Sequence, residues 1–352
     1  MTRKRVIIVG VITAVVIGVA GVVFDACNKD ELNTQDGKRM GSIGDSIIIE
    51  DIIIPVEFST IDFSRIGQEN GTLVFESIEH YGQTIDALLE ICNQYSNNYR
   101  TVLEARLGCS IEDANEEVVD AYITGTNFFQ FNPLMQFIEQ IGFTNSAYPV
   151  LRVQEIEWLA TSFETAENPF DAVGAGYVQS ALHNTGGCVK ICDCIVGYNM
   201  EDCGDGKKQK SGSWCFTSDP DDECDSRDVK YKDKDFDGNK RLKGKIATST
   251  INVHGKTGVY KKGTKNWSLW TKRVDIVISG RKWLQCDPYN PQEVLFNKDN
   301  TSWTGLTEKY HTFWNTPTYI ARTGYTTITG IHRCKDSKNG TIIASTITEI
   351  QR

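Results

Sequence analysis

The chain begins with a basic stretch, Arg3-Lys4-Arg5, and continues with 19 uncharged residues, 6–24, before it reaches Cys27. A basic start, an apolar run and a small residue next to a cysteine are typical of a lipoprotein export signal, in which Cys27 would be acylated and would begin the mature chain. The apolar run also approaches membrane-spanning length, so an uncleaved transmembrane anchor is the alternative. Either interpretation predicts that the rest of the chain crosses the inner membrane.

Cysteine usage agrees with an oxidising compartment. The chain has 11 cysteines, and lipidation of Cys27 would leave an even number for disulfides. Six fall in one short, polar segment: Cys188, Cys192, Cys194, Cys203, Cys215 and Cys224. Because such a segment cannot bury a core of its own, we expect disulfides there. A zinc site is the alternative, although the spacing differs from the paired Cys-x-x-Cys of a zinc ribbon.

Two cysteines, Cys92 and Cys109, precede that segment, and two more, Cys286 and Cys334, follow it. Cys286 and Cys334 are expected to form a disulfide within the C-terminal part. Cys92 and Cys109 could pair as well. Cys92, however, lies on an apolar helical stripe, so it could equally be a buried free thiol.

The N-terminal part has the pattern of helices. Apolar residues recur at steps of three and four from Ile78 to Val102, which predicts one buried helical stripe. Gly108 is expected to end this helix, and Ser110 with Asp113 to begin another in the manner of a capping box. Further helices are predicted for 132–140 and 150–161.

The C-terminal part has the pattern of strands. Strand-like runs cover 243–254, 258–262, 269–279, 325–334 and 341–350, separated by Gly, Asn and Asp. Asn339-Gly340 predicts a hairpin, because this pair accepts the positive φ of a tight turn. The chain is therefore expected to be of the α+β class, and its C-terminal domain to be an antiparallel β-sandwich. The predicted units are an anchor, 1–27; a tether, 28–45; a mainly helical domain, 46–187; a Cys-rich connector, 188–228; and a basic β-sandwich, 229–352.

Charge divides the chain at nearly the same place. Residues 1–225 hold 14 Lys and Arg against 35 Asp and Glu, a balance of −21, whereas residues 226–352 hold 23 against 11, a balance of +12. The basic part could attract an anionic polymer by long-range electrostatics. The alternative is that the two parts attract each other.

Asp233, Asp235 and Asp237, followed by Gly238, resemble the first half of a calcium loop. Carboxylates at alternate positions and a Gly at the sharp turn provide oxygen ligands for Ca²⁺. A full loop of this kind would have Glu at the twelfth position, where this chain has Gly244. The alternative is a solvated acidic turn that introduces the β-domain.

Aromatic and basic residues alternate in one run that could form a binding surface: Lys265, Trp267, Trp270, Lys272 and Arg273. Trp offers a flat face to sugar rings, and Lys and Arg can neutralise carboxylate or sulfate groups. The two Trp differ by three positions, so in a strand they would point to opposite faces, and at least one is expected in the core.

Catalytic motifs are not evident in the sequence. The five histidines are isolated, and there is no G-x-S-x-G elbow, Walker loop or dinucleotide-binding Gly pattern. We therefore expect a non-enzymatic binding or interaction protein of the cell envelope, with an anionic polysaccharide or a surface protein as partner and no nucleic acid. The alternatives are a structural subunit of a surface assembly and a secreted hydrolase whose acids are far apart in sequence.

Asn28-Lys29-Asp30-Glu31, directly after Cys27, resembles the export signals of surface lipoproteins of the Bacteroidota. Further segments follow in an order that resembles a group of uncharacterised lipoproteins of that phylum: Leu73-Val74-Phe75-Glu76, Phe131-Asn132-Pro133-Leu134, 155–159 and 177–191. In that group a helical region ends in an Asn-x-x-Gly-x-Val-x-Ile-Gly hairpin, and a β-rich domain follows.

The hairpin residues would here be Asn184, Gly187, Val189 and Ile191, with Cys192 in place of the final Gly. The resemblance implies this architecture and a place on the outer-membrane surface, and it implies no activity.

Overall fold

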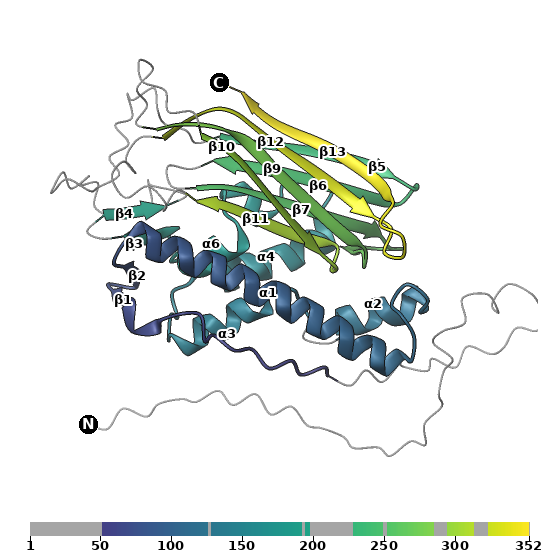
Figure 1. Ribbon diagram of the computed structural model, residues 1–352. Coiled ribbons are helices and arrows are strands. Elements are labelled where there is room, and N and C mark those ends of the chain that lie inside the picture. Colours follow the sequence, from purple (N-terminus) through teal and green to yellow (C-terminus); the bar gives the residue numbers. More distant parts are fainter. Residues whose placement is uncertain are drawn as a thin grey trace, which may run out of the picture.

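The computed structural model describes residues 51–125, 128–191, 194–197, 228–248, 252–284, 294–312 and 323–351. Helices and mainly antiparallel sheets are the regular elements of these ranges, so the α+β class is confirmed. Figure 1 shows a layer of helices on one side of a two-layered β structure. The predicted anchor and tether, with Cys27, lie outside the described residues. Within these ranges no helix combines the length and the hydropathy that a membrane span requires.

The predicted apolar stripe forms a long helix, α1 (Ile78–Leu107). Ser77 begins it, since its side chain accepts a hydrogen bond from the backbone N–H of His80. Gly108 ends it in the left-handed conformation at φ 72°, as predicted for a residue without a Cβ. One face of the helix is buried along most of its length.

Five shorter helices follow: α2 (Glu116–Gly125), α3 (Asn132–Gln140), α4 (Ala147–Thr161), α5 (Pro169–Ala172) and α6 (Tyr177–Leu182). The helices predicted at 132–140 and 150–161 are confirmed as α3 and α4. The predicted start at Ser110 is wrong. Ser110 donates to Asp113 within a turn, and Asn115 caps α2 by accepting from the N–H of Glu117.

A small sheet closes one end of the helical layer, in the order β1-β2-β3-β4. Its strands are β1 (Ile66–Glu69), β2 (Thr72–Phe75), β3 (Cys188–Ile191) and β4 (Cys194–Gly197). β2 and β3 pair in parallel, which joins residues far apart in the sequence. The Asn184 side chain accepts from the N–H groups of Gly186 and Cys188 and so fixes the entry into β3. β3 and β4, at the start of the predicted Cys-rich connector, therefore belong to the small sheet beside the helices.

Two larger antiparallel sheets form the sandwich. One has the order β11-β7-β6-β5, with β8 beside β7, and the other the order β10-β9-β12-β13. Their bounds are β5 (Asp228–Phe236), β6 (Lys240–Thr248), β7 (Asn252–Lys262), β8 (Trp267–Leu269), β9 (Arg273–Leu284), β10 (Val294–Ser302), β11 (Leu306–Thr312), β12 (Thr323–Lys335) and β13 (Ile342–Gln351). The predicted hairpin joins β12 to β13, and Gly340 supplies the positive φ of 70°.

The sandwich core lies between these two sheets. It contains Ile246 and Val253 from the first sheet and Ile276, Ile278, Ile328 and Ile350 from the second, all buried. Side chains on alternate positions of each strand point into this core, so the intervening positions point to the outer faces.

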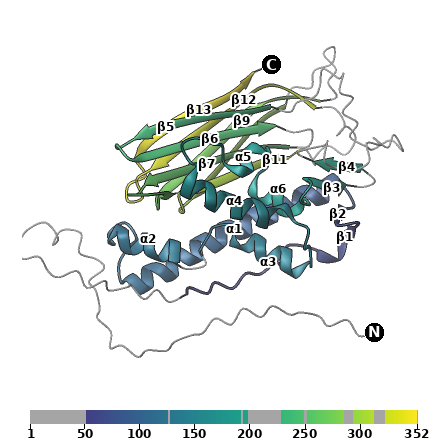
Figure 2. The ribbon, with the colours of Figure 1, turned by 180° about the vertical axis from the view of Figure 1, so that it is seen from behind.

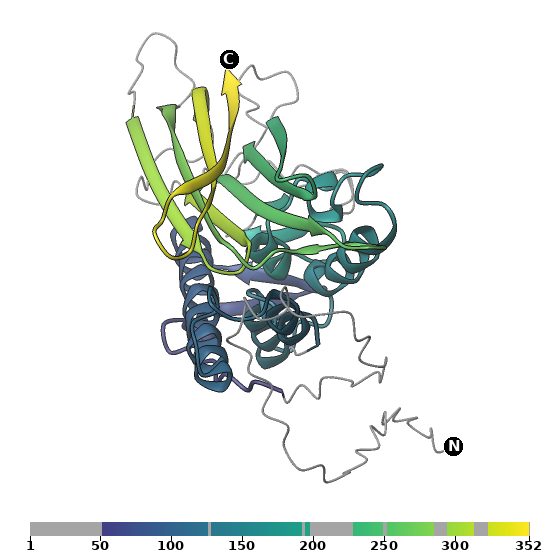
Figure 3. The same ribbon diagram turned by 90° about the vertical axis from the view of Figure 1, so that its right-hand side faces the viewer.

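The helices cover the outer face of the β11-β7-β6-β5 sheet, as Figures 2 and 3 show from behind and from the side. Leu306 and Tyr310 of β11 belong to the same hydrophobic core as α1, α3, α4 and α6. Trp158 and Phe163, at the end of α4, pack with Tyr260 of β7. The first sheet is thus buried on both faces, between the helices and the second sheet.

Candidate functional site

A cavity of about 560 Å³ opens where the helical layer leaves the outer face of β5, β6 and β7. The loop from Phe163 to Asn168, together with Asp171, forms one wall. The strands supply the other: Tyr231, Lys232, Asp233, Arg241, Lys243, Gly244, Lys245, Lys256, Gly258 and Tyr260. The volume is in the range of pockets that hold small molecules.

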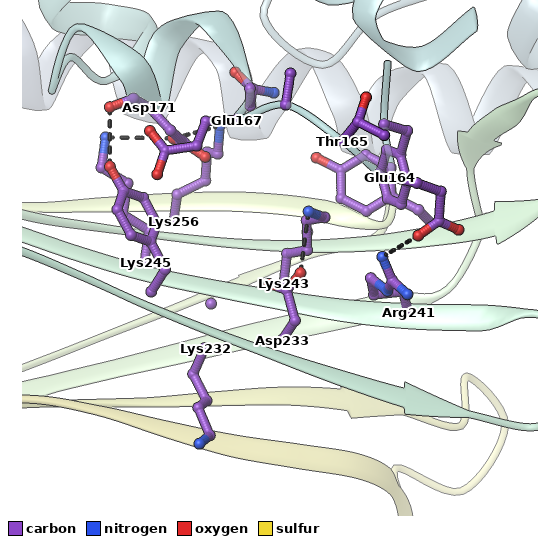
Figure 4. Close-up of a pocket in the computed structure, with 17 residues that line it drawn as sticks. Glu164, Thr165, Glu167, Asp171, Lys232, Asp233, Arg241, Lys243, Lys245 and Lys256 are labelled. Atoms are coloured by element: carbon purple, nitrogen blue, oxygen red, sulfur yellow. Dashed lines mark hydrogen bonds and ion pairs between the residues drawn. The ribbon is translucent and has the colours of Figure 1, made fainter. Parts of the chain in front are cut away.

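Strand periodicity explains why so many charges reach this cavity. Arg241, Lys243 and Lys245 alternate along β6 with Leu242 and Ile246, which are fully buried. Because successive side chains of a strand point to opposite faces, the apolar set enters the sandwich and the basic set faces the helices. Figure 4 shows the basic side chains reaching toward the loop above the sheet.

Lys245 and Lys256 are direct neighbours on β6 and β7 and are almost completely buried. Like charges in this position repel each other. Asp171 relieves the repulsion, because its Oδ1 lies 3.3 Å from Nζ of Lys245 and 3.1 Å from Nζ of Lys256. Burial raises the pKa of Asp171, but the two ammonium groups outweigh it and the net pKa is lowered.

Glu308 of β11 is the cross-strand neighbour of Lys256 on its other side. Its carboxylate accepts from the backbone N–H of Tyr177 at 3.0 and 3.1 Å, at the start of α6. Gly176 is required at this contact, because a Cβ there would collide with Tyr310 and Glu308. Burial raises the pKa of Glu308 to about 7, although Lys256 and Lys245 act in the opposite direction.

A second buried carboxylate, Glu155 of α4, holds the helices above the cavity together. It accepts from the Tyr177 hydroxyl at 2.6 Å and from the Asn168 amide at 2.5 Å. Arg152 of the same helix completes its coordination at 2.8 Å. The loop that forms the roof of the cavity is thereby fixed to α4 and α6.

Tyr260 contributes its ring and its hydroxyl to the cavity wall. Its side chain is 2% exposed and lies over Gly258, where a Cβ would meet the ring. Its hydroxyl makes no hydrogen bond to any residue that the structure describes, and burial raises its pKa. The hydroxyl thus belongs to the surface that a ligand or water in the cavity would meet.

The predicted calcium residues are placed differently. Asp233 lies 3.1 Å from Lys243, Asp235 contacts Arg241, and Asp237 lies 2.5 Å from Lys240 in the turn between β5 and β6. Within the described ranges, no group of three His, Cys, Asp or Glu residues is arranged to hold a metal ion. This arrangement agrees with the alternative of an acidic turn at the start of the β-domain, since an adjacent cation pairs with each carboxylate separately.

The predicted aromatic platform is also not formed. Trp267 stacks on Phe163 at 4.2 Å, and Trp270 donates to Glu116 at 2.5 Å; their side chains are 9% and 5% exposed. Both Trp are therefore core residues that join the strands to the helices. The sequence predicted that at least one of the two would be in the core. Lys265 is exposed beside them.

Lys272 and Arg273 are half-buried. Lys272 lies over the ring of Trp270 at 5.1 Å, and Arg273 lies 5.4 Å from the ring of Trp303. These basic residues thus pack on aromatic rings of their own chain.

The cysteine predictions are corrected in part. Cys334 is a buried free thiol, so its predicted disulfide with Cys286 is wrong. Its neighbours explain this, since it packs in the apolar sandwich core against Leu242 and Val274. Cys92 is likewise free and buried, whereas Cys109 and Cys188 are disulfide-bonded. Cys192, Cys203, Cys215, Cys224 and Cys286 lie outside the described residues, and of Cys194 only the backbone, in β4, is described.

Attraction between the two parts of the chain is confirmed. Besides the pairs at Asp171, Arg241 lies 2.9 Å from Glu164, and Lys261 lies 3.3 Å from Glu116. Lys338 contacts Asp113. The basic outer face of the sheet is thus largely neutralised by the helical layer.

The sequence did not single out Asp171, Lys245, Lys256, Tyr260 or Glu308. The alternation of Arg241, Lys243 and Lys245 was visible, and it indicates a polar outer face on a strand. Nothing in the sequence pairs this face with Asp171, because their contact depends on how the helices dock.

No protein-family model and no curated protein matched the chain. Among solved structures, it is similar to the crystal structure of a DUF4848 family protein from Bacteroides thetaiotaomicron. The identity is 14%, the TM-score is 0.21, and the match covers 82% of this chain and 100% of that chain. A TM-score this low does not establish a shared fold.

Replacing Asp171 should destabilise the protein. Asp171→Ala leaves two buried ammonium groups without their shared carboxylate, which costs about 3–5 kcal/mol of unfolding free energy. The double variant Asp171→Ala/Lys245→Met removes one of these charges and should recover part of the loss. Urea denaturation measures the unfolding free energy of both variants. The control is Asp233→Ala, which removes a half-exposed partner of Lys243 and should cost less than about 1 kcal/mol. Equal losses for Asp171→Ala and Asp233→Ala would contradict this interpretation.

The pH dependence of stability should report on Glu308. Its pKa is raised from 4.5 to about 7 in the folded chain, so the folded state binds the extra proton between these values. The contribution of Glu308 is therefore fully present below about pH 4.5 and is lost as the pH rises through about 7. Over that window the unfolding free energy of the wild type should fall relative to that of Glu308→Gln. Parallel curves in urea denaturation would show that the carboxyl titrates normally.

Proposed function

We propose that this protein is a non-enzymatic binding protein of the bacterial cell envelope, with a saccharide-sized polar ligand held in the cavity between the 163–171 segment and β5–β7. The observation that carries the proposal is the cavity itself, whose wall combines the Tyr260 side chain with a series of paired charges. A ligand hydroxyl or carbonyl would hydrogen-bond to the Tyr260 hydroxyl and to these charged groups.

The charges around the cavity favour a neutral or zwitterionic ligand over a polyanion. Carboxylates and cations alternate along its walls, and most of them are paired: Lys245 and Lys256 with Asp171, Lys243 with Asp233, and Arg241 with Glu164. Such pairs present donors and acceptors side by side, which suits the hydroxyl groups of a sugar. Tyr231, 40% exposed, offers an aromatic face at the rim.

Binding of an extended anionic polymer, which the charge of residues 226–352 suggested, has less support. Lys245, Lys256 and Lys261 face acidic residues of the helical layer. A fragment that contains the β-sandwich alone would expose these cations and would bind polyanions that the whole chain does not bind. The full chain is therefore the material for any binding experiment.

Attachment to the cell envelope is supported by the sequence. The basic start, the uncharged run 6–24 and Cys27 have the order of a lipoprotein signal. The disulfides at Cys109 and Cys188 agree with an oxidising compartment.

Loss of the Tyr260 hydroxyl should weaken ligand binding. The full chain is first tested against a panel of neutral, zwitterionic and anionic oligosaccharides, and the tightest binder is then titrated by calorimetry. Tyr260→Phe keeps the ring and removes one hydrogen bond, so the Kd should rise by about 3- to 10-fold. Tyr95→Phe removes a hydroxyl far from the cavity and should leave Kd unchanged. The proposal fails if no oligosaccharide binds or if both variants behave alike.

Lipidation at Cys27 should be visible by metabolic labelling. An alkynyl fatty acid fed to expressing cells should label the wild type and not Cys27→Ala, and the variant should leave the membrane fraction. Cys92→Ala, at a buried thiol, serves as the control and should remain labelled. A Cys27→Ala variant that stays in the membrane fraction would favour the transmembrane anchor.

A further inference from the structure

Glu167 contributes a carboxylate to the wall of the cavity that pairs with no cation of the described residues. The other charged side chains that face the cavity are engaged with each other: Lys245 and Lys256 with Asp171, Lys243 with Asp233, and Arg241 with Glu164. Lys232 also belongs to the wall, but Figure 4 shows its side chain extending away from the helical layer. Within the described ranges, the cavity therefore presents one charge that the protein does not neutralise, and this charge is negative.

The position of Glu167 in the roof of the cavity is fixed by its two neighbours. The carbonyl of Ala166 accepts a hydrogen bond from Nε1 of Trp158 at 2.7 Å, and the Asn168 amide donates to Glu155 at 2.5 Å. Glu167 lies between these two anchored residues and is itself exposed. Its backbone is therefore held in place by α4 while its carboxylate stays accessible to a ligand.

Tyr231 of β5 lies near this carboxylate, at the rim of the cavity. Burial raises the pKa of the Tyr231 hydroxyl, and the negative charges of Asp171 and Glu167 raise it further. The hydroxyl donates to the backbone carbonyl of Asp171 at 3.0 Å, which fixes the ring, and Tyr231 is still 40% exposed. An aromatic face and an unpaired carboxylate are thus both available at the rim.

A cationic group fits this combination. An ammonium is attracted to the negative face of an aromatic ring, and it forms charge-assisted hydrogen bonds with a carboxylate. An anionic group would be repelled by Glu167, and the buried cations nearby already share Asp171. A neutral hydroxyl could hydrogen-bond to Glu167, but it would leave the carboxylate without a counterion.

We propose that Glu167 and Tyr231 form a subsite for an ammonium group, and that the ligand of the cavity is a saccharide with a free amino group. This inference rests on the proposed function and names the ligand class within it. The ammonium lies over the ring of Tyr231 and donates to Glu167, while the hydroxyl groups of the sugar meet Tyr260 and the paired charges of the wall. Among neutral and zwitterionic saccharides, the subsite selects those that carry the amino group.

A matched pair of disaccharides tests the inference on the full chain. N,N′-diacetylchitobiose and chitobiose, its form with free amino groups, have the same ring skeleton and differ in their charge. Calorimetric titration near neutral pH should give a Kd for chitobiose that is about 3- to 10-fold lower. The preference should vanish above the pKa of the sugar's amino groups, because a neutral amine loses the attraction to the carboxylate.

Two variants assign the preference to the subsite. Glu167→Gln keeps the size of the side chain and removes its charge, so the preference for chitobiose should disappear. Tyr231→Leu removes the aromatic face and should raise the Kd for chitobiose by about 2- to 5-fold. Glu157→Gln is the matched control, since Glu157 is an exposed residue of α4 outside the cavity wall, and this variant should keep the preference.

The possible outcomes separate this inference from the function on which it rests. Equal Kd values for the two disaccharides in the wild type, or a preference that survives in Glu167→Gln, would overturn the amino-group subsite and leave a saccharide-binding cavity in place. If neither disaccharide binds, the subsite is likewise wrong. The proposed function then stands only if another saccharide of the panel binds.

Discussion

The bridge from Asp171 to Lys245 and Lys256 is the interaction on which the arrangement of the two layers depends. Two buried cations on neighbouring strands would repel each other and lose their hydration, so the outer face of β6 and β7 cannot be covered by apolar helices alone. Asp171 satisfies both charges from α5, and Glu155 fixes α4 and α6 around it. The helical layer is therefore complementary in charge to the sheet as well as apolar.

This complementarity explains the uneven distribution of charge along the sequence. A chain with an acidic N-terminal part and a basic C-terminal part was expected to attract a polyanion or to fold upon itself, and the contacts of Arg241, Lys261 and Lys338 with the helical layer confirm the second possibility. Net charge per segment thus describes the attraction between layers. It does not describe the surface that a partner meets.

Local patterns were predictable, and contacts between distant segments were not. The stripe of α1, its end at Gly108 and the β12–β13 hairpin depend on neighbouring residues and follow from periodicity and turn chemistry. The parallel pairing of β2 with β3 joins strands more than a hundred residues apart, which no local pattern reveals. The same holds for the cavity, since Tyr260, Asp171 and Glu308 lie on three elements. The ion pairs of Asp233, Asp235 and Asp237 could not be predicted, because the motif gives no information about the cations on the facing strand.

The cavity and the ion pairs of Asp171 share one wall, so the contacts that join the two layers also shape the binding site. These pairs hold α5, and with it the roof of the cavity, against β6 and β7. A binding site whose roof is fixed before the ligand arrives loses less conformational entropy on binding. The ion pairs between the layers would thus favour binding without any contact of their own to the ligand.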